Sequence, residues 1–136
     1  MTEDRIAAGE RVMEELLGAV PETTEHFKEL MAVTKAQVFG EIWTRPALSW
    51  RDRELITIAI LAEQGGRERQ LRVHLKAALR VGLTPDELKE TMIQIACYSG
   101  YPAAFSSMSV LAEVLNEQAV DEIDVEPDAD AAPEAR

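Results

Sequence analysis

The sequence predicts an all-α domain, a compact bundle of about six to seven helices. Apolar residues recur at helical spacing in nearly every segment, and the alternating runs typical of strands are essentially absent. Glycine and proline divide these segments at several points, which indicates short turns between helices. At 136 residues, 46% of them hydrophobic, the chain is long enough to bury the core of one domain.

The first helix is expected over about Glu3 to Leu17, because its apolar residues share one face and Gly18 and Pro21 follow it. A second helix would begin at Thr23 or Thr24, since either hydroxyl can cap a first turn. The residues expected to face inward are Ile6, Met13, Leu16 and Leu17 in the first helix and Phe27, Leu30, Met31 and Val38 in the second.

The segment from Gly40 to Leu48 is too short and too broken by proline for a long helix, so we expect a turn or short helix leading into a loop. Ser49, with Asp52 in the first turn, predicts the start of a third helix. That helix runs through LITIAILA, is apolar on most sides and is therefore expected to be central. Gly65 and Gly66 end it.

A fourth helix is expected from about Arg67 to Val81, closing at Gly82 in a left-handed C-cap. The next helix has the clearest start, because Thr84 and Glu87 form a capping box and Pro85 occupies the first helical position. Its expected buried stripe consists of Leu88, Met92, Ile95 and Ala96.

The stretch SGYP at residues 99–102 separates that helix from a last one, which carries Met108, Leu111 and Leu115. From Ala119 onward the chain is rich in Asp, Glu, Ala and Pro and poor in large apolar residues. We therefore predict a folded domain over residues 1–118 and an acidic disordered tail over 119–136.

Composition narrows the possible partners and compartments. The net charge of -11 disfavours nucleic acid, whose phosphates need a clustered excess of basic residues. The N-terminus lacks the pattern of a secretion leader, and no run of about 18 apolar residues suggests a membrane helix. A single cysteine, Cys97, excludes an internal disulfide and a CxxC redox pair, and its apolar neighbours predict an inert core thiol. We expect a cytoplasmic protein.

One segment reverses the acidic balance. Between Arg45 and Arg80 there are eight basic and four acidic residues. Such a segment suits a small anionic ligand, although the same residues could simply form solvated helix faces.

Two residues are the first candidates for chemistry. His74 follows Leu71 by three positions and precedes Ala78 by four, so it faces inward, where it could move protons or serve only as a core residue. Glu54 lies one turn before Ile58. It could be a buried carboxylate with a raised pKa, or a solvated glutamate favoured by the helix dipole.

A second group of candidates lies in the segment from Gly40 to Leu48, where its members are spaced two residues apart. Glu41, Trp43 and Arg45 offer a carboxylate, a flat apolar wall and a carboxylate-binding fork. The tryptophan beside arginine could equally mark an oligomer contact. Phosphate-binding glycine loops, serine elbows and HExxH metal motifs are absent from the sequence, so no cofactor and no metal are indicated.

Four consecutive strings together resemble the carboxymuconolactone decarboxylase family, in its order and at its spacing. They are GEIWTRPAL at 40–48, RELITIAILA at 53–62, LRVHLKAALRVGLTPDELKE at 71–90 and YSGYPAA at 98–104. The resemblance implies a helical fold shared with alkylhydroperoxidase D and a ring-like homo-oligomer, a trimer or hexamer. The redox branch of that superfamily has two cysteines where this chain has Arg67 and Gln70, so thiol-based peroxide reduction is excluded.

The resemblance further implies cofactor-independent decarboxylation of the anionic lactone 4-carboxymuconolactone to the enol-lactone of 3-oxoadipate, in the β-ketoadipate pathway of aromatic degradation. His74 would be the proton donor or oxyanion partner, oriented by Glu41 or Glu54. The implied substrate-binding residues are Arg45, Arg72, Trp43 and Tyr98.

Two alternatives stay open. Glu54 and Phe105 stand where decarboxylases of the family often have other residues, which would suit proton transfer, cyclisation or isomerisation on another lactone or enolisable acid. A catalytically silent binding or structural oligomer is the alternative from another class.

Overall fold

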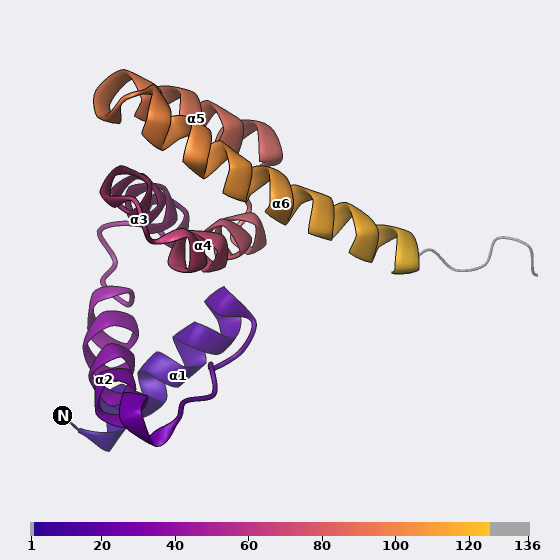
Figure 1. Ribbon diagram of the computed structural model, residues 1–136. Helices are drawn as coiled ribbons and strands as arrows, with labels where there is room; N and C mark the ends of the chain where they lie inside the picture. The colour runs from indigo at the N-terminus through magenta and orange to yellow at the C-terminus, as the bar shows by residue number, and fades with distance from the viewer. Residues whose placement is uncertain (1, 126–136) are drawn as a thin grey trace, which may run out of the picture.

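The computed structural model describes residues 2–125, which form six α-helices, one 3₁₀ turn and one π-helical segment (Figure 1). In chain order these are α1 (Glu3–Leu17), η1 (Glu25–Phe27), α2 (Lys28–Val33), η2 (Thr34–Ile42), α3 (Trp50–Gln64), α4 (Glu68–Arg80), α5 (Pro85–Ser99) and α6 (Tyr101–Val125). Over these residues there is no strand, so the predicted all-α class is confirmed. None of these helices combines the length and the apolar character needed to cross a membrane.

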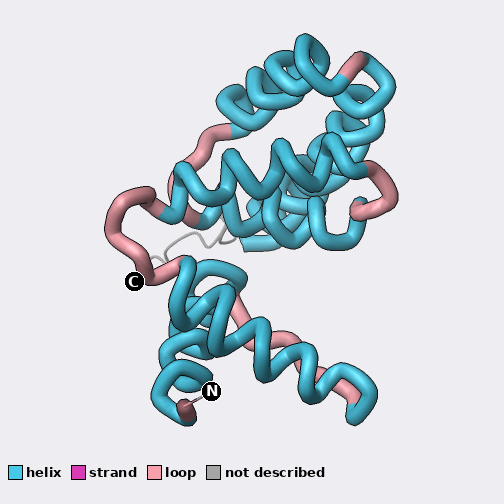
Figure 2. The backbone as a smooth tube through the Cα atoms, turned by 90° about the vertical axis from the view of Figure 1, so that its left-hand side faces the viewer, coloured by secondary structure: helices cyan, strands magenta, loops and turns pink. Residues whose placement is uncertain are grey.

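The helices form two adjoining groups (Figures 1 and 2). In the first, α1 packs along η2, and in the second, α3 packs on α4 while α5 packs on α6. The core of the second group consists of Ile58, Ala62, Leu71, Leu75, Ala78, Leu83, Leu88, Met92, Ile95, Val110, Leu111 and Val114. A smaller cluster joins the groups and consists of Val12, Met13, Leu16, Phe39, Trp43 and Ala77. Because Ala77 belongs to α4, this helix contributes to both cores.

Two glycines allow α1 and η2 to approach each other closely. A Cβ atom on Gly9 would lie 1.9 Å from the carbonyl oxygen of Lys35, and one on Gly40 would lie 2.3 Å from that of Arg5. Any side chain at either position would collide with backbone, which cannot move aside as a flexible side chain can. These contacts fix η2, and η2 leads directly into Trp43.

The predicted helix ends are largely confirmed. The hydroxyl of Ser49 accepts a hydrogen bond from the backbone N–H of Asp52, and Thr84 and Glu87 form the full capping box. Helix α1 has the predicted bounds, and α4 ends just before Gly82, whose φ of 99° is left-handed.

The predicted inward face of the second helical segment is wrong at three of its four residues, since Met31 alone is half-buried against the smaller core cluster. Phe27, Leu30 and Val38 are exposed, whereas Ala36 and Phe39 are buried. For Val38 and Phe39 the cause is the π-helical geometry of η2, in which each N–H bonds to the carbonyl five residues earlier and the turn is wider than in an α-helix. The side chains therefore advance by a smaller angle per residue than the predicted pattern assumed.

One residue of α5 and one side of α3, both expected in the core, are exposed instead. Cys97 is exposed, because it lies two positions beyond the buried Ile95 and so faces almost the opposite way on α5. Helix α3 packs against α4, α5 and α6, as a central helix should, yet Ile56 and Ile60 are about half exposed. Both results indicate apolar surface that the single chain does not cover.

Helix α6 is longer than the sequence predicts. It continues through Val125, past Ala119, where the acidic tail was expected to begin, and its C-terminal end extends beyond the bundle (Figure 1). Ion pairs from Glu113 and Glu117 to α4 hold its middle against the bundle. The rest of the predicted tail, residues 126–136, lies outside the described residues.

Candidate active site

A histidine and a buried carboxylate meet where α3 packs on α4. Nδ1 of His74 lies 2.9 Å from Oε2 of Glu54. The Glu54 side chain has no exposed surface, and that of His74 is 18% exposed. The helical spacing explains the meeting, because Glu54 lies one turn before the buried Ile58, and His74 lies between the buried Leu71 and Ala78, three positions after one and four before the other.

The environment of Glu54 opposes its charge. Burial raises the pKa of this carboxyl group above the ordinary glutamate value, and the hydrogen bond and charge of His74 lower it in part. The second oxygen, Oε1, is buried and has no hydrogen-bond partner among the described residues. The carboxyl group and the imidazole are therefore arranged to share a proton.

An aromatic wall covers one side of the imidazole. The ring of Trp43 stacks on that of His74, with centroids 6.2 Å apart and planes 25° apart. Phe39 stacks in turn on Trp43, at 6.0 Å and 29°. The indole N–H of Trp50 donates to the carbonyl of Trp43 over 2.9 Å, which holds the turn after η2 against the start of α3.

This arrangement leaves the other imidazole nitrogen available. Nδ1 faces Glu54, and the hydrogen bonds of residues 2–125 include none to Nε2. When Glu54 is ionised, Nδ1–H donates to it and Nε2 can gain or lose a proton. A histidine held in this way can act as a general acid, a general base or an oxyanion donor.

The two arginines near the Trp43 turn differ in their surroundings. Arg45 is exposed, and its backbone carbonyl accepts a hydrogen bond from Nη2 of Arg53 over 3.1 Å. Arg53 is half-buried, and its Nε is buried without a partner among the described residues. The fold thus brings a second guanidinium to the turn that carries Trp43.

Of the two carboxylates predicted to orient the histidine, Glu54 makes the contact. Glu41 lies on η2 and forms an ion pair with Arg5 over 3.1 Å, with both side chains about half exposed. This contact ties η2 to α1. The chemical role of either residue stays a prediction.

The remaining predicted site residues lie apart from this pair in the single chain. Arg72 is on α4 but forms ion pairs with Glu113 and Glu117 of α6, the latter over 2.6 Å. Tyr98 is near the end of α5, and it is 85% exposed in the single chain. Their roles in substrate binding stay predictions.

Sequence reasoning missed Trp50, Arg53 and Phe39 as parts of this site. Trp50 could have been found as the second tryptophan, near the N-cap of α3, whereas the sequence has no signal that sets Arg53 apart from Arg51. Within the described part of the chain, no group of three or more His, Cys, Asp or Glu side chains could hold a metal ion.

Comparisons with known proteins point to one family. A sequence profile of the carboxymuconolactone decarboxylase family matches residues 28–113, which include Trp43, Glu54 and His74. A 4-carboxymuconolactone decarboxylase from Acinetobacter baylyi is 43% identical over 79 residues, 58% of this chain and 58% of that protein.

Two more distant relatives match similar stretches. The nitrosuccinic acid decarboxylase npaB of Metarhizium robertsii is 29% identical over 79 residues, 58% of this chain and 54% of its own length. An uncharacterised 15.0 kDa protein of Paracoccus denitrificans, from the nqo9-nqo10 intergenic region, is 33% identical over 81 residues, 59% of this chain and 60% of its own. Each match spans less than two thirds of the relative.

Proposed function

Because the chain belongs to the carboxymuconolactone decarboxylase family, we propose that it converts 4-carboxymuconolactone to the enol-lactone of 3-oxoadipate without a cofactor. The observation that carries the proposal is the buried Glu54, bonded to a histidine that has one nitrogen left for a substrate. The 43% identity to the decarboxylase of Acinetobacter baylyi supports the choice of substrate.

The reaction needs an electron sink and a proton. The bond to the departing carboxylate carbon breaks, carbon dioxide leaves, and the electron pair passes through the ring double bond to the lactone carbonyl oxygen. The resulting dienolate then takes one proton on the carbon next to the carbonyl, which gives the enol-lactone. An acid must therefore lie over that carbon, and a donor near the developing oxyanion lowers the barrier.

His74 has the position and partner for the proton transfer. With Nδ1–H donated to ionised Glu54, the imidazolium is stabilised and its Nε2–H delivers the proton to carbon. Solvent then returns a proton to Nε2, since the side chain is partly exposed. The indole of Trp43 makes one side of the site apolar, which disfavours the charged carboxylate that is lost.

The substrate keeps one carboxylate, which needs a cation. Arg45 is exposed at the Trp43 turn and is one candidate. Arg72 would have to exchange its ion pairs with Glu113 and Glu117 for the substrate. Tyr98, which is exposed on α5, could contribute only where another chain brings it to a site.

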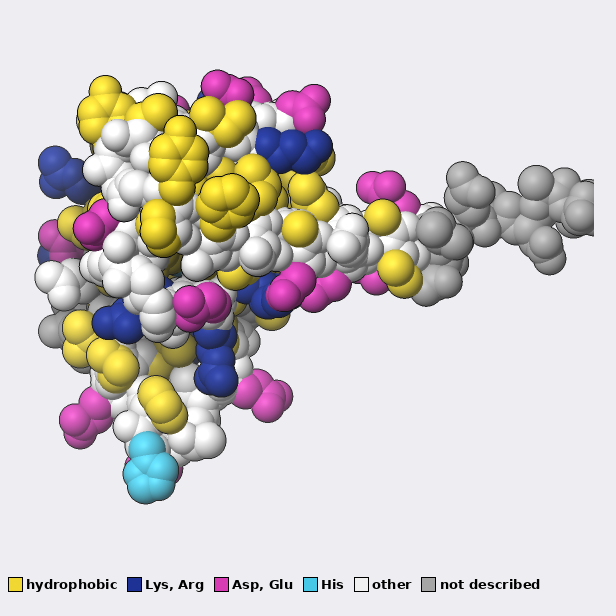
Figure 3. Space-filling model, turned by 45° about the horizontal axis from the view of Figure 1, so that its top comes forward, with side chains coloured by type: hydrophobic (Ala, Val, Ile, Leu, Met, Phe, Trp, Pro, Cys, Tyr) yellow, Lys and Arg dark blue, Asp and Glu magenta, His cyan; other side chains and the backbone are white. Residues whose placement is uncertain are grey.

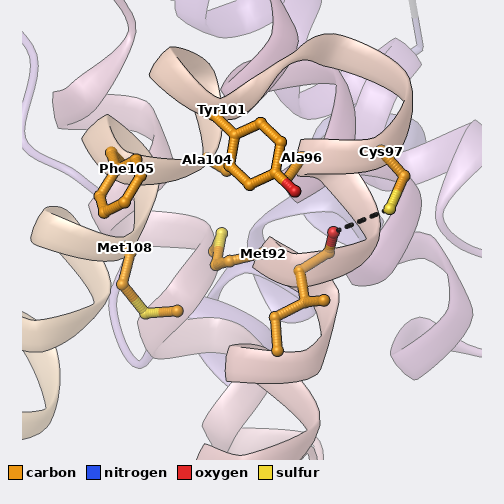
Figure 4. Close-up of a pocket in the computed structure, with 8 residues that line it drawn as sticks. Met92, Ala96, Cys97, Tyr101, Ala104, Phe105 and Met108 are labelled. Carbon is orange, nitrogen blue, oxygen red and sulfur yellow. Dashed lines mark hydrogen bonds between the residues drawn. The ribbon is translucent and has the colours of Figure 1, made fainter.

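We further propose that the chain forms a homo-oligomer, a ring-like trimer or hexamer, through α5 and α6. An exposed apolar face lies on these helices, in a cluster of hydrophobic side chains visible in Figure 3. It surrounds a cavity of about 200 Å³ (Figure 4) lined almost wholly by apolar groups, among them Met92, Tyr101, Phe105 and Met108. A monomer rarely exposes such a continuous apolar surface. We also propose that the protein acts in the cytoplasm, in the β-ketoadipate pathway of aromatic degradation.

A second candidate is decarboxylation of another acid that leaves a delocalised anion. The observation in its favour is the similarity to npaB, named for nitrosuccinic acid. Nitrosuccinic acid and 4-carboxymuconolactone each have two carboxylates and lose one from a carbon whose electron pair can move onto an oxygen. The same proton donor, His74, and the same cation for the retained carboxylate would serve both substrates.

The test is to mix the purified protein with freshly generated 4-carboxymuconolactone, and separately with nitrosuccinate, and to follow both by NMR. Rapid appearance of the enol-lactone, with slower or no loss of nitrosuccinate, supports the main proposal. Turnover of nitrosuccinate alone supports the second candidate. A folded protein that turns over neither acid would favour the non-catalytic oligomer.

A further inference from the structure

Arg53 differs from every other basic residue in the described part of the chain. It is half-buried, and it is the one partly buried cation there without a carboxylate partner. By contrast, Arg51 pairs with Glu87 and Arg72 with Glu113 and Glu117. A guanidinium held partly out of water without a counter-charge is unfavourable unless a ligand supplies one.

The hydrogen bonds of Arg53 point to the same conclusion. Its Nη2 donates to the carbonyl of Arg45 over 3.1 Å, which anchors the guanidinium. Its Nε is buried and has no acceptor among the described residues. A buried donor of this kind calls for an acceptor, and the guanidinium fork fits the two oxygens of a carboxylate.

Arg53 also lies close to the candidate catalytic pair. It precedes Glu54 in α3, and the carbonyl that it holds belongs to the residue two positions after Trp43. The Cα atoms of Trp43 and Arg45 are at most about 7.6 Å apart, because consecutive Cα atoms are separated by about 3.8 Å. Since Trp43 stacks on His74 with ring centroids 6.2 Å apart, the guanidinium and the imidazole both lie beside the turn that carries Trp43.

We propose that Arg53, and not Arg45, binds the carboxylate that the substrate retains. Arg45 supplies its backbone carbonyl, which orients the guanidinium, and its own side chain stays in solvent. This inference rests on the proposed decarboxylase function and extends it, because an anion site beside His74 selects acids with a second carboxylate. Both 4-carboxymuconolactone and nitrosuccinate meet that condition.

The test uses a ligand that cannot react. The probe is the saturated γ-lactone that carries an acetate side chain, compared with its uncharged methyl ester in equilibrium titrations. We expect the parent protein to bind the acid about tenfold or more tightly than the ester, as charge-assisted hydrogen bonds typically allow. Arg53→Met should bind both ligands equally, whereas Arg45→Met should keep the preference for the acid.

Two further variants separate charge from architecture. Trp50→Phe removes the other hydrogen bond to this turn, so loosening of the turn alone should weaken acid and ester alike. Arg53→Lys keeps the charge without the fork, and should retain a reduced preference for the acid. It replaces Arg53→Met if circular dichroism shows that the methionine variant is unfolded.

The outcomes distinguish this inference from the proposed function. A preference for the acid that survives in Arg53→Met, or that is lost in Arg45→Met, overturns the assignment. Turnover of 4-carboxymuconolactone by a parent that does not prefer the acid also overturns it, while leaving the decarboxylase proposal intact. If the preference for the acid depends on Arg53 but the protein does not turn over 4-carboxymuconolactone, the anion site is supported and 4-carboxymuconolactone is ruled out as the substrate.

Discussion

Nδ1 of His74 lies 2.9 Å from Oε2 of Glu54, and the glutamate side chain is wholly buried. The contact joins α4 to α3 and fixes the direction in which the imidazole faces. Because Glu54 occupies one ring nitrogen, proton exchange with a ligand must use the other. The Trp43 indole then limits the imidazole on one face. Each of these features can be altered separately.

The buried carboxyl group predicts a pH-dependent stability. Burial raises the pKa of Glu54 in the folded protein, so the folded state binds a proton more tightly than the unfolded state. The free energy of unfolding should therefore fall as pH rises from the ordinary glutamate pKa through the raised pKa of Glu54. Glu54→Gln lacks this titration. Denaturant unfolding of both proteins over a pH series measures the difference.

The difference between the two proteins isolates Glu54 and its contact with His74, because groups that do not contact Glu54 titrate alike in both. The free energy of unfolding of the parent minus that of Glu54→Gln should decline as pH rises over that window. A flat difference would mean that folding leaves the pKa of Glu54 unshifted, and a difference that increases would mean that folding lowers it; either result contradicts a pKa raised by burial.

The close approach of α1 and η2 predicts that Gly9→Ala destabilises the fold. Alanine favours a helix over glycine by about 0.5–1 kcal/mol, but the new Cβ would meet the Lys35 carbonyl. Relief of such a collision typically costs about 1–3 kcal/mol, so the net free energy of unfolding should fall. Urea denaturation measures it.

The exposed Ala7 in the same helix provides the control. Ala7→Gly should lower the free energy of unfolding by helix propensity alone, about 0.5–1 kcal/mol. If Gly9→Ala instead raised the free energy of unfolding by a similar amount, α1 and η2 would have to lie farther apart than is implied by the 1.9 Å between that Cβ and the Lys35 carbonyl oxygen.

The apolar face of α5 and α6 predicts that Phe105→Glu disrupts assembly. Phe105 is 72% exposed in the single chain, and a charge there would be buried in any interface through this face. Light scattering after size-exclusion chromatography should show a smaller species with unchanged helical circular dichroism. Leu30→Glu, at an exposed apolar residue of α2, should leave the mass unaltered. The opposite pattern would move the interface to α2.

Local signals accounted for most of the fold. The caps at Ser49 and Thr84 could be predicted because each depends on a side chain and a backbone group three residues apart. The inward face of η2 could not, because π-helical bonding is not encoded in the apolar pattern and moves Phe39 into the core instead of Val38. The ion pairs that hold the middle of α6 could not be predicted either, because they join α6 to residues of α4 that are far away in the sequence.

The candidate site was predictable to a similar extent. His74 and Glu54 could be found because each follows the periodicity of its own helix. Arg53 could not be distinguished from its neighbours, because its contact with the Arg45 carbonyl depends on how the chain turns between η2 and α3. The ion pairs of Arg72 could not be predicted for the same reason, since its partners lie 41 and 45 residues further along the chain.

The measurement that most directly tests the catalytic role of His74 is single-turnover decarboxylation of 4-carboxymuconolactone by the parent and two histidine variants. His74→Gln can still hydrogen-bond Glu54 but cannot deliver a proton, so its rate should fall by about 10²–10⁴-fold. His26→Ala alters the exposed histidine of η1 and should keep the parent rate. Full turnover by a folded His74→Gln protein would contradict the account.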